Sequence, residues 1–253
     1  MAAQTTSGKI RVGVFGAGGR MGATVCDAVM ADPDLELVAA VDPACAGTVI
    51  HGITVGADPR AMADAGVQVA VDFTIAAASR TNLQWCALHG VHAVVGTTGF
   101  SDADLAGFRS AFASSNCMIA ANFAISAVLM MKFAEMASPW FETAEIIELH
   151  HDNKADAPSG TAITLAEGVF EESKYTDWSI DETKADTILP ITVERTEEVP
   201  GTHSIEYKSV VDSISIQHEA HSRQGFALGA VIASEWIQDK KGVFTMNDVL
   251  NIN

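Results

Sequence analysis

The chain has 253 residues, of which 48% are hydrophobic and 19% are charged, and its formal net charge is -17. This length allows one large domain or two small ones, and the apolar fraction is sufficient for a packed core. The acidic balance argues against nucleic acid or an anionic membrane as a partner. We find neither a signal-peptide pattern nor an apolar run of membrane-spanning length. Four widely spaced cysteines without a CxxC pair favour a reduced, cytoplasmic protein.

The first half of the chain alternates apolar runs with helix-like segments. The expected elements, in chain order, are a strand at 10–15, a helix at 20–30, strands at 35–41 and 67–73, a helix at 76–89, a strand at 91–95, a helix at 102–113 and a strand at 118–121. Strands and helices that alternate at this spacing predict an α/β fold, a Rossmann-type doubly wound parallel sheet.

The pattern changes after Phe123. The expected elements are then a helix at 124–137, a strand at 144–149, a helix at about 159–172, a polar acidic stretch at 175–202 broken by Pro190 and Pro200, paired strands at 204–211 and 213–219, and a helix at 225–236. We therefore predict a dinucleotide-binding domain over 1–123, with 224–253 returning to it, and a second, α+β domain over 124–223.

A glycine-rich turn follows the first expected strand and opens the first expected helix. It reads Gly16-Ala17-Gly18-Gly19-Arg20-Met21-Gly22. A dinucleotide pyrophosphate binds at such a turn, although the match to G-x-G-x-x-G is imperfect because Met21 takes the last glycine position. A turn without a ligand is the alternative interpretation.

Asp42 ends the second expected strand, where an acid can bind the adenosine ribose hydroxyls. Pro43 follows it and offers no charge to a 2′-phosphate. We therefore expect NADH as the preferred cofactor, with NADPH as the alternative.

Two further segments follow expected strands and belong to the same sheet edge. They are Gly96-Thr97-Thr98 and Ala120-Ala121-Asn122-Phe123. Ligands of open parallel sheets bind at the carboxyl ends of the strands, so both segments are candidates for contact with a nicotinamide.

The loop at 148–161 concentrates the reactive side chains of the second half. It contains His150, His151 and Lys154, and then a Pro-Ser-Gly-Thr segment typical of a helix start. Imidazole exchanges protons near neutral pH, and a lysine and a helix N-terminus attract carboxylates. Two histidines with Asp152 could instead bind a metal, but adjacent side chains on a strand point to opposite faces, so we predict no metal site.

The sequence Glu-Leu-His-His through Lys154, followed by Asp-Ala-Pro-Ser-Gly-Thr-Ala at 156–162, resembles the signature of the dihydrodipicolinate reductase family. The glycine turn, Asp72-Phe73-Thr74, Gly96–Phe100 and Ala121–Phe123 extend this resemblance along the chain in the family's order. The resemblance implies NAD(P)H-dependent reduction of 4-hydroxy-tetrahydrodipicolinate to tetrahydrodipicolinate, in the diaminopimelate route to lysine. It also implies a homotetramer built through the second domain, which would bind the substrate, a small dicarboxylate.

The resemblance further implies a role for each matching residue. His150 would donate a proton, Lys154 would be a second donor, and His151, Gly160 and Thr161 would bind the substrate carboxylates. The cofactor would contact Gly16, Ala17, Gly18, Gly19, Arg20, Met21, Asp42, Gly96, Thr97, Thr98, Ala120, Ala121, Asn122 and Phe123. By contrast, His203, His218 and His221 are expected to be core or surface groups.

Two other functions remain open from the sequence. One is a different two-domain NAD-dependent dehydrogenase that acts on a small oxo acid. The other is a non-catalytic dinucleotide sensor that keeps the fold. The paired histidines disfavour the first, and the complete set of proton donors disfavours the second.

Overall fold

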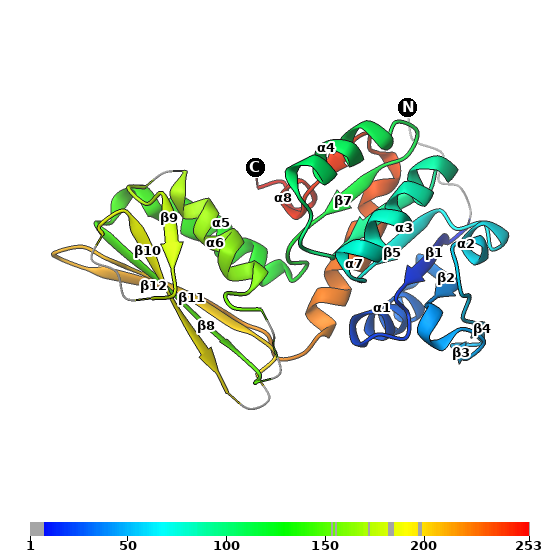
Figure 1. Ribbon diagram of the computed structural model, residues 1–253, viewed down its shortest axis with the longest axis horizontal. Coiled ribbons are helices and arrows are strands. Elements are labelled where there is room, and N and C mark those ends of the chain that lie inside the picture. Colours follow the sequence, from blue (N-terminus) through cyan, green and yellow to red (C-terminus); the bar gives the residue numbers. More distant parts are fainter. Residues whose placement is uncertain are drawn as a thin grey trace. The chain divides into compact units, whose positions relative to one another are not determined.

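The computed structural model describes residues 8–152, 154, 156–171, 173–181, 185–196 and 199–252. The chain forms two compact units (Figure 1). The first contains the described residues up to Phe123 together with Phe226–Asn251, and the second contains Ala124–Gly225. Among the described residues, no helix has the length and apolar character needed to cross a membrane.

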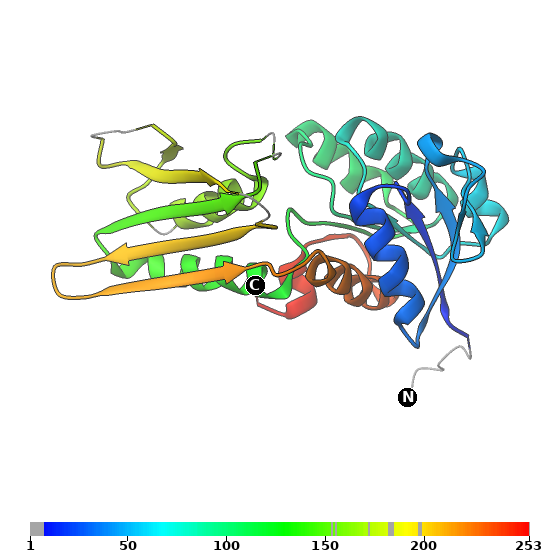
Figure 2. The same cartoon turned by 90° about the horizontal axis from the view of Figure 1, so that it is seen from below.

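The first unit is built on a six-stranded parallel sheet in the order β13-β7-β6-β5-β1-β2. The strands are β1 (Ile10–Phe15), β2 (Leu35–Val41), β5 (Val69–Asp72), β6 (His92–Val95), β7 (Cys117–Ile119) and β13 (Val243–Phe244). The main helices are α1 (Arg20–Ala31), α3 (Ala76–His89), α4 (Asp102–Ala111) and α7 (Gln224–Trp236). Helices cover both faces of this sheet (Figures 1 and 2), which confirms the predicted doubly wound α/β fold.

Local chemistry explains these elements. All four residues of β5, Val-Ala-Val-Asp, are buried, as expected for a parallel strand covered on both faces. Ser101 and Asp104 form a capping box at the start of α4. Gly90 ends α3 in the left-handed conformation that glycine adopts most easily.

Shorter elements complete the first unit. They are η1 (Pro43–Cys45), β3 (Val49–Ile50), β4 (Ile53–Thr54), α2 (Arg60–Asp64), η3 (Ile237–Asp239) and α8 (Met246–Leu250). Strand β1 lies between β2 and β5, so the chain crosses from one side of β1 to the other. Ligands of doubly wound sheets bind at the carboxyl ends of the strands at such a crossover.

The second unit is a five-stranded mixed sheet in the order β12-β11-β8-β10-β9. Its strands are β8 (Thr143–His150), β9 (Asp177–Ser179), β10 (Ile188–Arg195), β11 (Thr202–Lys208) and β12 (Ser213–Glu219). Helices α5 (Ile125–Ala137) and α6 (Gly160–Phe170) lie on the same face of the sheet (Figure 2), and η2 (Ser138–Trp140) follows α5. The core between them includes Met130, Ile146, Leu165, Ile191 and Ile205.

The prediction for 175–202 was wrong in one respect, because Pro190 lies inside β10 and does not break it. Leu189 and Ile191 point into the core from alternate positions, and β10 runs parallel to β8 over Ile191–Arg195. Burial of Leu189 and Ile191 stabilises the strand even though the segment around it is polar. The end of α6 that we expected at residue 172 lies outside the described residues.

Candidate active site

The glycine turn after β1 is packed so closely that side chains would not fit. Gly16 has a φ of 71°, and a Cβ on Gly22 would overlap the carbonyl oxygen of Gly16. Gly22 therefore fills the helix-packing role that the sequence pattern assigned to position 21, one residue earlier. Met21 is the second residue of α1 and does not interrupt the turn.

Asp42 lies beside this turn. Its Oδ2 accepts a hydrogen bond from the Gly18 N–H at 3.0 Å, and its Oδ1 accepts one from the Ala44 N–H at 3.0 Å. The carboxylate is thus fixed at the end of β2, next to the start of α1. A glycine cradle at a helix N-terminus with a neighbouring carboxylate fits the pyrophosphate and ribose of a dinucleotide.

The segments that follow β5 and β6 are tied together by Asp72, which is buried at the end of β5. Its carboxylate accepts hydrogen bonds from the Thr74 N–H at 2.8 Å, from Asn82 Nδ2 at 2.9 Å and from Thr97 Oγ1 at 3.3 Å. Thr97 is buried, and its hydroxyl also donates to the Thr74 carbonyl at 3.0 Å. Asp72 was not among the predicted site residues, although it fixes one of them.

Aromatic packing supports the same sheet edge. The rings of Phe73 and Phe123 meet edge to face at 5.6 Å between centroids, and a Cβ on Gly96 would overlap the Phe73 ring. Ala120 continues the parallel ladder by donating its N–H to Val95. Of the other predicted cofactor residues, Arg20, Thr98 and Ala121 are exposed, whereas Asn122 is buried.

In the second unit, β8 ends at His150, whose side chain is buried, and the predicted loop follows. His151 is half-buried and donates its N–H to Val199 at 3.0 Å. Lys154 Nζ donates to both carboxylate oxygens of Asp156, at 2.8 Å and 2.9 Å. Lys154, the residue predicted to bind a substrate carboxylate, is therefore paired with Asp156 of its own loop.

The loop leads into α6, which begins at Gly160, as the Pro-Ser-Gly-Thr segment predicted. Ser159 is the N-cap, and its Oγ accepts a hydrogen bond from the Ala162 N–H at 3.2 Å. Gly160 and Thr161 form the first turn, where the helix dipole favours an anion.

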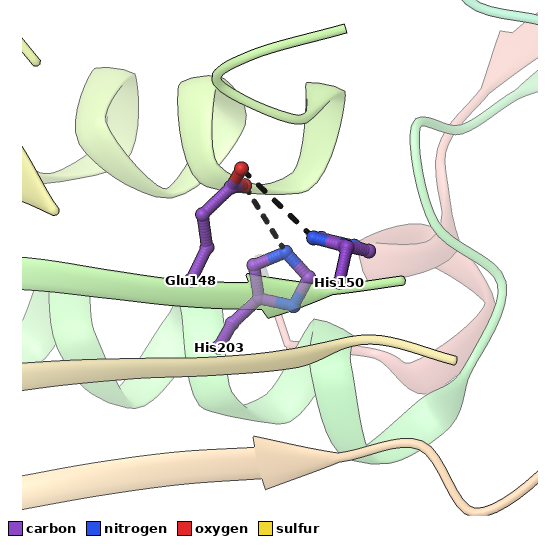
Figure 3. Close-up of side chains that lie close together, drawn as sticks. All are labelled: Glu148, His150 and His203. Carbon is purple, nitrogen blue, oxygen red and sulfur yellow. Dashed lines mark ion pairs between the residues drawn. The ribbon is translucent and has the colours of Figure 1, made fainter. Parts of the chain in front are cut away.

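Glu148 lies two residues before His150, and the period of a strand puts both side chains on the same buried face. Its carboxylate accepts hydrogen bonds from Arg195 Nη1 at 3.2 Å and from the Ser159 N–H at 2.9 Å. Figure 3 shows this carboxylate next to two imidazoles, 3.9 Å from His150 Nδ1 and 3.8 Å from His203 Nε2. Glu148 and Arg195 were not among the site residues predicted from the sequence, and His203 was expected only to be a core or surface group.

The sheet register brings these groups together. His203 on β11 pairs with Glu148, and Arg195 on β10 pairs with His150. His203 Nε2 is also 2.9 Å from the Ser159 hydroxyl, so it contacts the N-cap of α6. The proposed proton donor and the start of α6 are thereby connected through one buried polar cluster.

Burial decides the charge state of both imidazoles. It lowers the pKa of His150 to about 4, against the opposing effect of Glu148, while Lys154 and Arg195 lower this pKa further. Burial also lowers the pKa of His203 to about 3, and His150 adds to the effect. Both rings are therefore neutral at pH 7, and His150 must gain a proton before it can donate one as an imidazolium.

Glu148, His150 and His203 each offer one ligand atom within 4.8 Å of the others, a spacing that a metal ion could use. However, the carboxylate already accepts from a guanidinium and a backbone N–H, and His203 Nε2 already contacts a hydroxyl. These contacts satisfy most of the candidate ligand atoms without an ion. We therefore interpret the cluster as a hydrogen-bonded charge network.

The parallel sheet with its glycine turn, together with the imidazole and lysine of the second unit, defines the class of this protein: an NAD(P)H-dependent oxidoreductase. Comparison with known families specifies it further. The family described as dihydrodipicolinate reductase, N-terminus, matches residues 10–123, and dihydrodipicolinate reductase, C-terminus, matches residues 126–250. The chain belongs to the dihydrodipicolinate reductase family.

Individual relatives agree with this assignment. The 4-hydroxy-tetrahydrodipicolinate reductase of Corynebacterium urealyticum is 38% identical over 248 residues, which cover 92% of this chain and 95% of the relative. That of Christiangramia forsetii is 41% identical over 196 residues, covering 74% of this chain and 81% of the relative. Among solved structures, the dipicolinate-bound dihydrodipicolinate reductase from Paenisporosarcina sp. TG-14 superimposes with a TM-score of 0.80 at 28% identity, covering 94% of this chain and 97% of the other.

Proposed function

We propose that this protein reduces 4-hydroxy-tetrahydrodipicolinate to tetrahydrodipicolinate with NADH or NADPH, a step of diaminopimelate and lysine biosynthesis. The observation that carries the proposal is that both halves of the chain match one reductase family. The second half also places an imidazole, a lysine and a helix N-terminus within one short stretch of the chain. A dicarboxylate requires cations and N–H donors, and the reduction requires a proton donor.

The steps of the reaction define what the cofactor and the protein must each supply. Loss of water from the 4-hydroxy substrate leaves a conjugated C=C–C=N system. Hydride adds to its terminal carbon, and the resulting enamine takes a proton on the adjacent carbon, which restores the imine. The nicotinamide supplies the hydride when bound, and the protein supplies orientation, charge and the proton.

We assign the proton donation to His150, with Lys154 as the second donor and as a partner for a substrate carboxylate. The burial of His150 at the end of β8 supports this role because a buried imidazole is held in one orientation. A positioned acid of this kind is worth about 10²–10⁴-fold in rate. His151 and the first turn of α6, Gly160 and Thr161, would bind the carboxylates.

The other proposed cofactor contacts are the glycine turn and the segments that follow β6 and β7. Asp42 supports a preference for NADH, because its fixed carboxylate suits two ribose hydroxyls and repels a 2′-phosphate. The four free cysteines support a reducing, cytoplasmic location.

The sheet of the second unit supports the proposed homotetramer. Within the described residues, α5 and α6 cover only one face of this sheet, and Ile147 and Leu149 are half-buried on the other. Ile147→Glu should lower the mass measured by light scattering below that of four chains. Leu88→Glu on α3, where the side chain is 83% exposed, is the matched control and should leave the assembly intact. A wild-type mass below four chains would overturn the tetramer.

The reaction itself is tested with purified protein, NADH or NADPH, and freshly generated 4-hydroxy-tetrahydrodipicolinate. We expect loss of the reduced-nicotinamide absorbance that depends on the substrate. His150→Gln and Lys154→Ala should each slow turnover by at least about 10²-fold while the Kd for NADH stays within about twofold of wild type. No oxidation with either cofactor would refute the proposed reaction, and loss of NADH binding in either variant would refute the division of roles.

A further inference from the structure

Glu148 is a fully buried carboxylate whose position requires an explanation. Its relative exposure is 0%, and a carboxylate in such a place is strongly destabilising unless it is paired and hydrogen-bonded. Arg195 and the Ser159 N–H stabilise it, at 3.2 Å and 2.9 Å. A hydrophobic residue of similar size would fill the same space without needing these partners, so the charge invites a functional explanation.

The two carboxylate oxygens face different parts of the candidate site. Oε1 accepts from Arg195 and lies 3.9 Å from His150 Nδ1, whereas Oε2 accepts the Ser159 N–H at the start of α6. In the part of the chain that the structure describes, His150 Nδ1 is buried and has no hydrogen-bond partner. An approach of about 1 Å would bring it into hydrogen-bond range of Oε1.

The opposite ring nitrogen, Nε2, lies on the side of Gly201. A Cβ built on Gly201 would lie 3.0 Å from His150 Nε2. The ring is therefore oriented with Nδ1 toward the carboxylate and Nε2 toward Gly201, and the lack of a side chain on Gly201 leaves space for it. Figure 3 shows the same orientation, with the dashed line from the carboxylate ending on Nδ1.

We propose that Glu148 is the positioning residue of the proton donor: its carboxylate accepts the Nδ1–H of His150, so that Nε2 is the nitrogen that gains and donates the catalytic proton. This inference rests on the proposed role of His150. In the step, the imidazolium gives its Nε2 proton to the substrate carbon and keeps its Nδ1–H on Glu148. A proton from solvent then restores the imidazolium.

The charges around His150 agree with this arrangement. Of those that act on its pKa, Glu148 has the largest effect and raises it, Asp156 raises it less, and Lys154 and Arg195 lower it. The neighbouring ring of His203, 5.0 Å away between centroids, is itself neutral because burial lowers its pKa to about 3. Glu148 is therefore the principal group that favours the charged, proton-donating form.

Glu148→Gln tests this role because glutamine keeps the shape and an acceptor for the Ser159 N–H but removes the charge. The measurement is kcat/KM against pH for the wild type, Glu148→Gln and Glu167→Gln. Glu167 is exposed on α6 of the same unit, outside both the buried cluster and the open face of the sheet, and serves as the matched control. We expect the decline of kcat/KM with rising pH, which reports loss of the His150 imidazolium, to begin about one pH unit lower in Glu148→Gln, with about tenfold lower activity at neutral pH and an unchanged Kd for NADH.

Superimposable profiles for the wild type and Glu148→Gln would overturn the proposal, and so would a uniform loss at every pH. If Glu148→Gln does not fold, nitrogen NMR of wild-type His150 decides instead: the Nδ1–H tautomer is expected, and the Nε2–H tautomer would refute the inference. The His150→Gln variant distinguishes failure of the proposed role of His150 from failure of the proposed role of Glu148. Full activity in that variant would overturn the assignment of His150, whereas an inactive His150→Gln with an unshifted Glu148→Gln would overturn only the role of Glu148.

Discussion

Replacing His203 by glutamine should weaken the acid sensitivity of the second unit. His203 is 3% exposed, and burial lowers its pKa from 6.5 to about 3. Because the folded pKa lies below the unfolded one, the unfolded chain takes up the proton first as the pH falls. The contribution of His203 to the free energy of unfolding has its full value above pH 6.5. It is lost progressively as the pH falls toward about 3.

The magnitude follows from the two pKa values. Between pH 7 and pH 5 the unfolded imidazole becomes almost fully protonated, whereas folded His203 stays neutral. Linkage then predicts a loss of about 2 kcal/mol from this one residue. Glutamine does not titrate, and its side-chain amide can still hydrogen-bond to the Ser159 hydroxyl that contacts His203.

Urea unfolding of the wild type, His203→Gln and His221→Gln at pH 7 and pH 5 measures the effect. The wild type should lose about 2 kcal/mol more than His203→Gln over this interval. His221, whose side chain is 84% exposed, is the control, and its variant should follow the wild type. An equal loss in the wild type and His203→Gln would refute the argument that burial keeps His203 neutral.

Three glycine and carboxylate variants test other parts of the account. Gly22→Ala should destabilise the first unit by about 1–3 kcal/mol in thermal unfolding, because the new Cβ would overlap the Gly16 backbone. Gly107→Ala is the control: it lies in α4 with open space around it and should be neutral or slightly stabilising. Gly201→Ala should lower kcat by about tenfold to a hundredfold with little change in NADH affinity, because its Cβ would crowd the His150 ring, and an unchanged kcat would contradict this. Asp42→Ala should raise the Kd for NADH more than that for NADPH by titration calorimetry, and equal losses would mean that Asp42 is only structural.

The first unit could be predicted closely because its determinants are local. Apolar runs of three to seven residues mark the strands β1, β2, β5, β6 and β7, and the glycine turn and Ser101 mark helix starts. The strand β13 was missed because two residues, Val243 and Phe244, carry no periodic signal. Its place beside β7 depends on the return of the chain to the first unit.

The candidate site of the second unit was only partly predictable. Glu148 and His150 are separated by two positions, so the strand period alone could have placed them on one face. His203 and Arg195 could not be found this way, because each reaches Glu148 through the register of a different strand. The segment that contains β10 is polar enough to obscure its alternating apolar positions, and the expectation that Pro190 would break it was therefore wrong.

The proposed reaction requires this chain to deliver a hydride from a nicotinamide to a conjugated imine dicarboxylate. Turnover of 4-hydroxy-tetrahydrodipicolinate with NADH that carries deuterium at the transferable position, followed by mass spectrometry of the product, tests it most directly. We expect one deuterium in each molecule of tetrahydrodipicolinate formed, and loss of the labelled product in His150→Gln. Oxidation of the cofactor without deuterium in the product, or no oxidation at all, would contradict it.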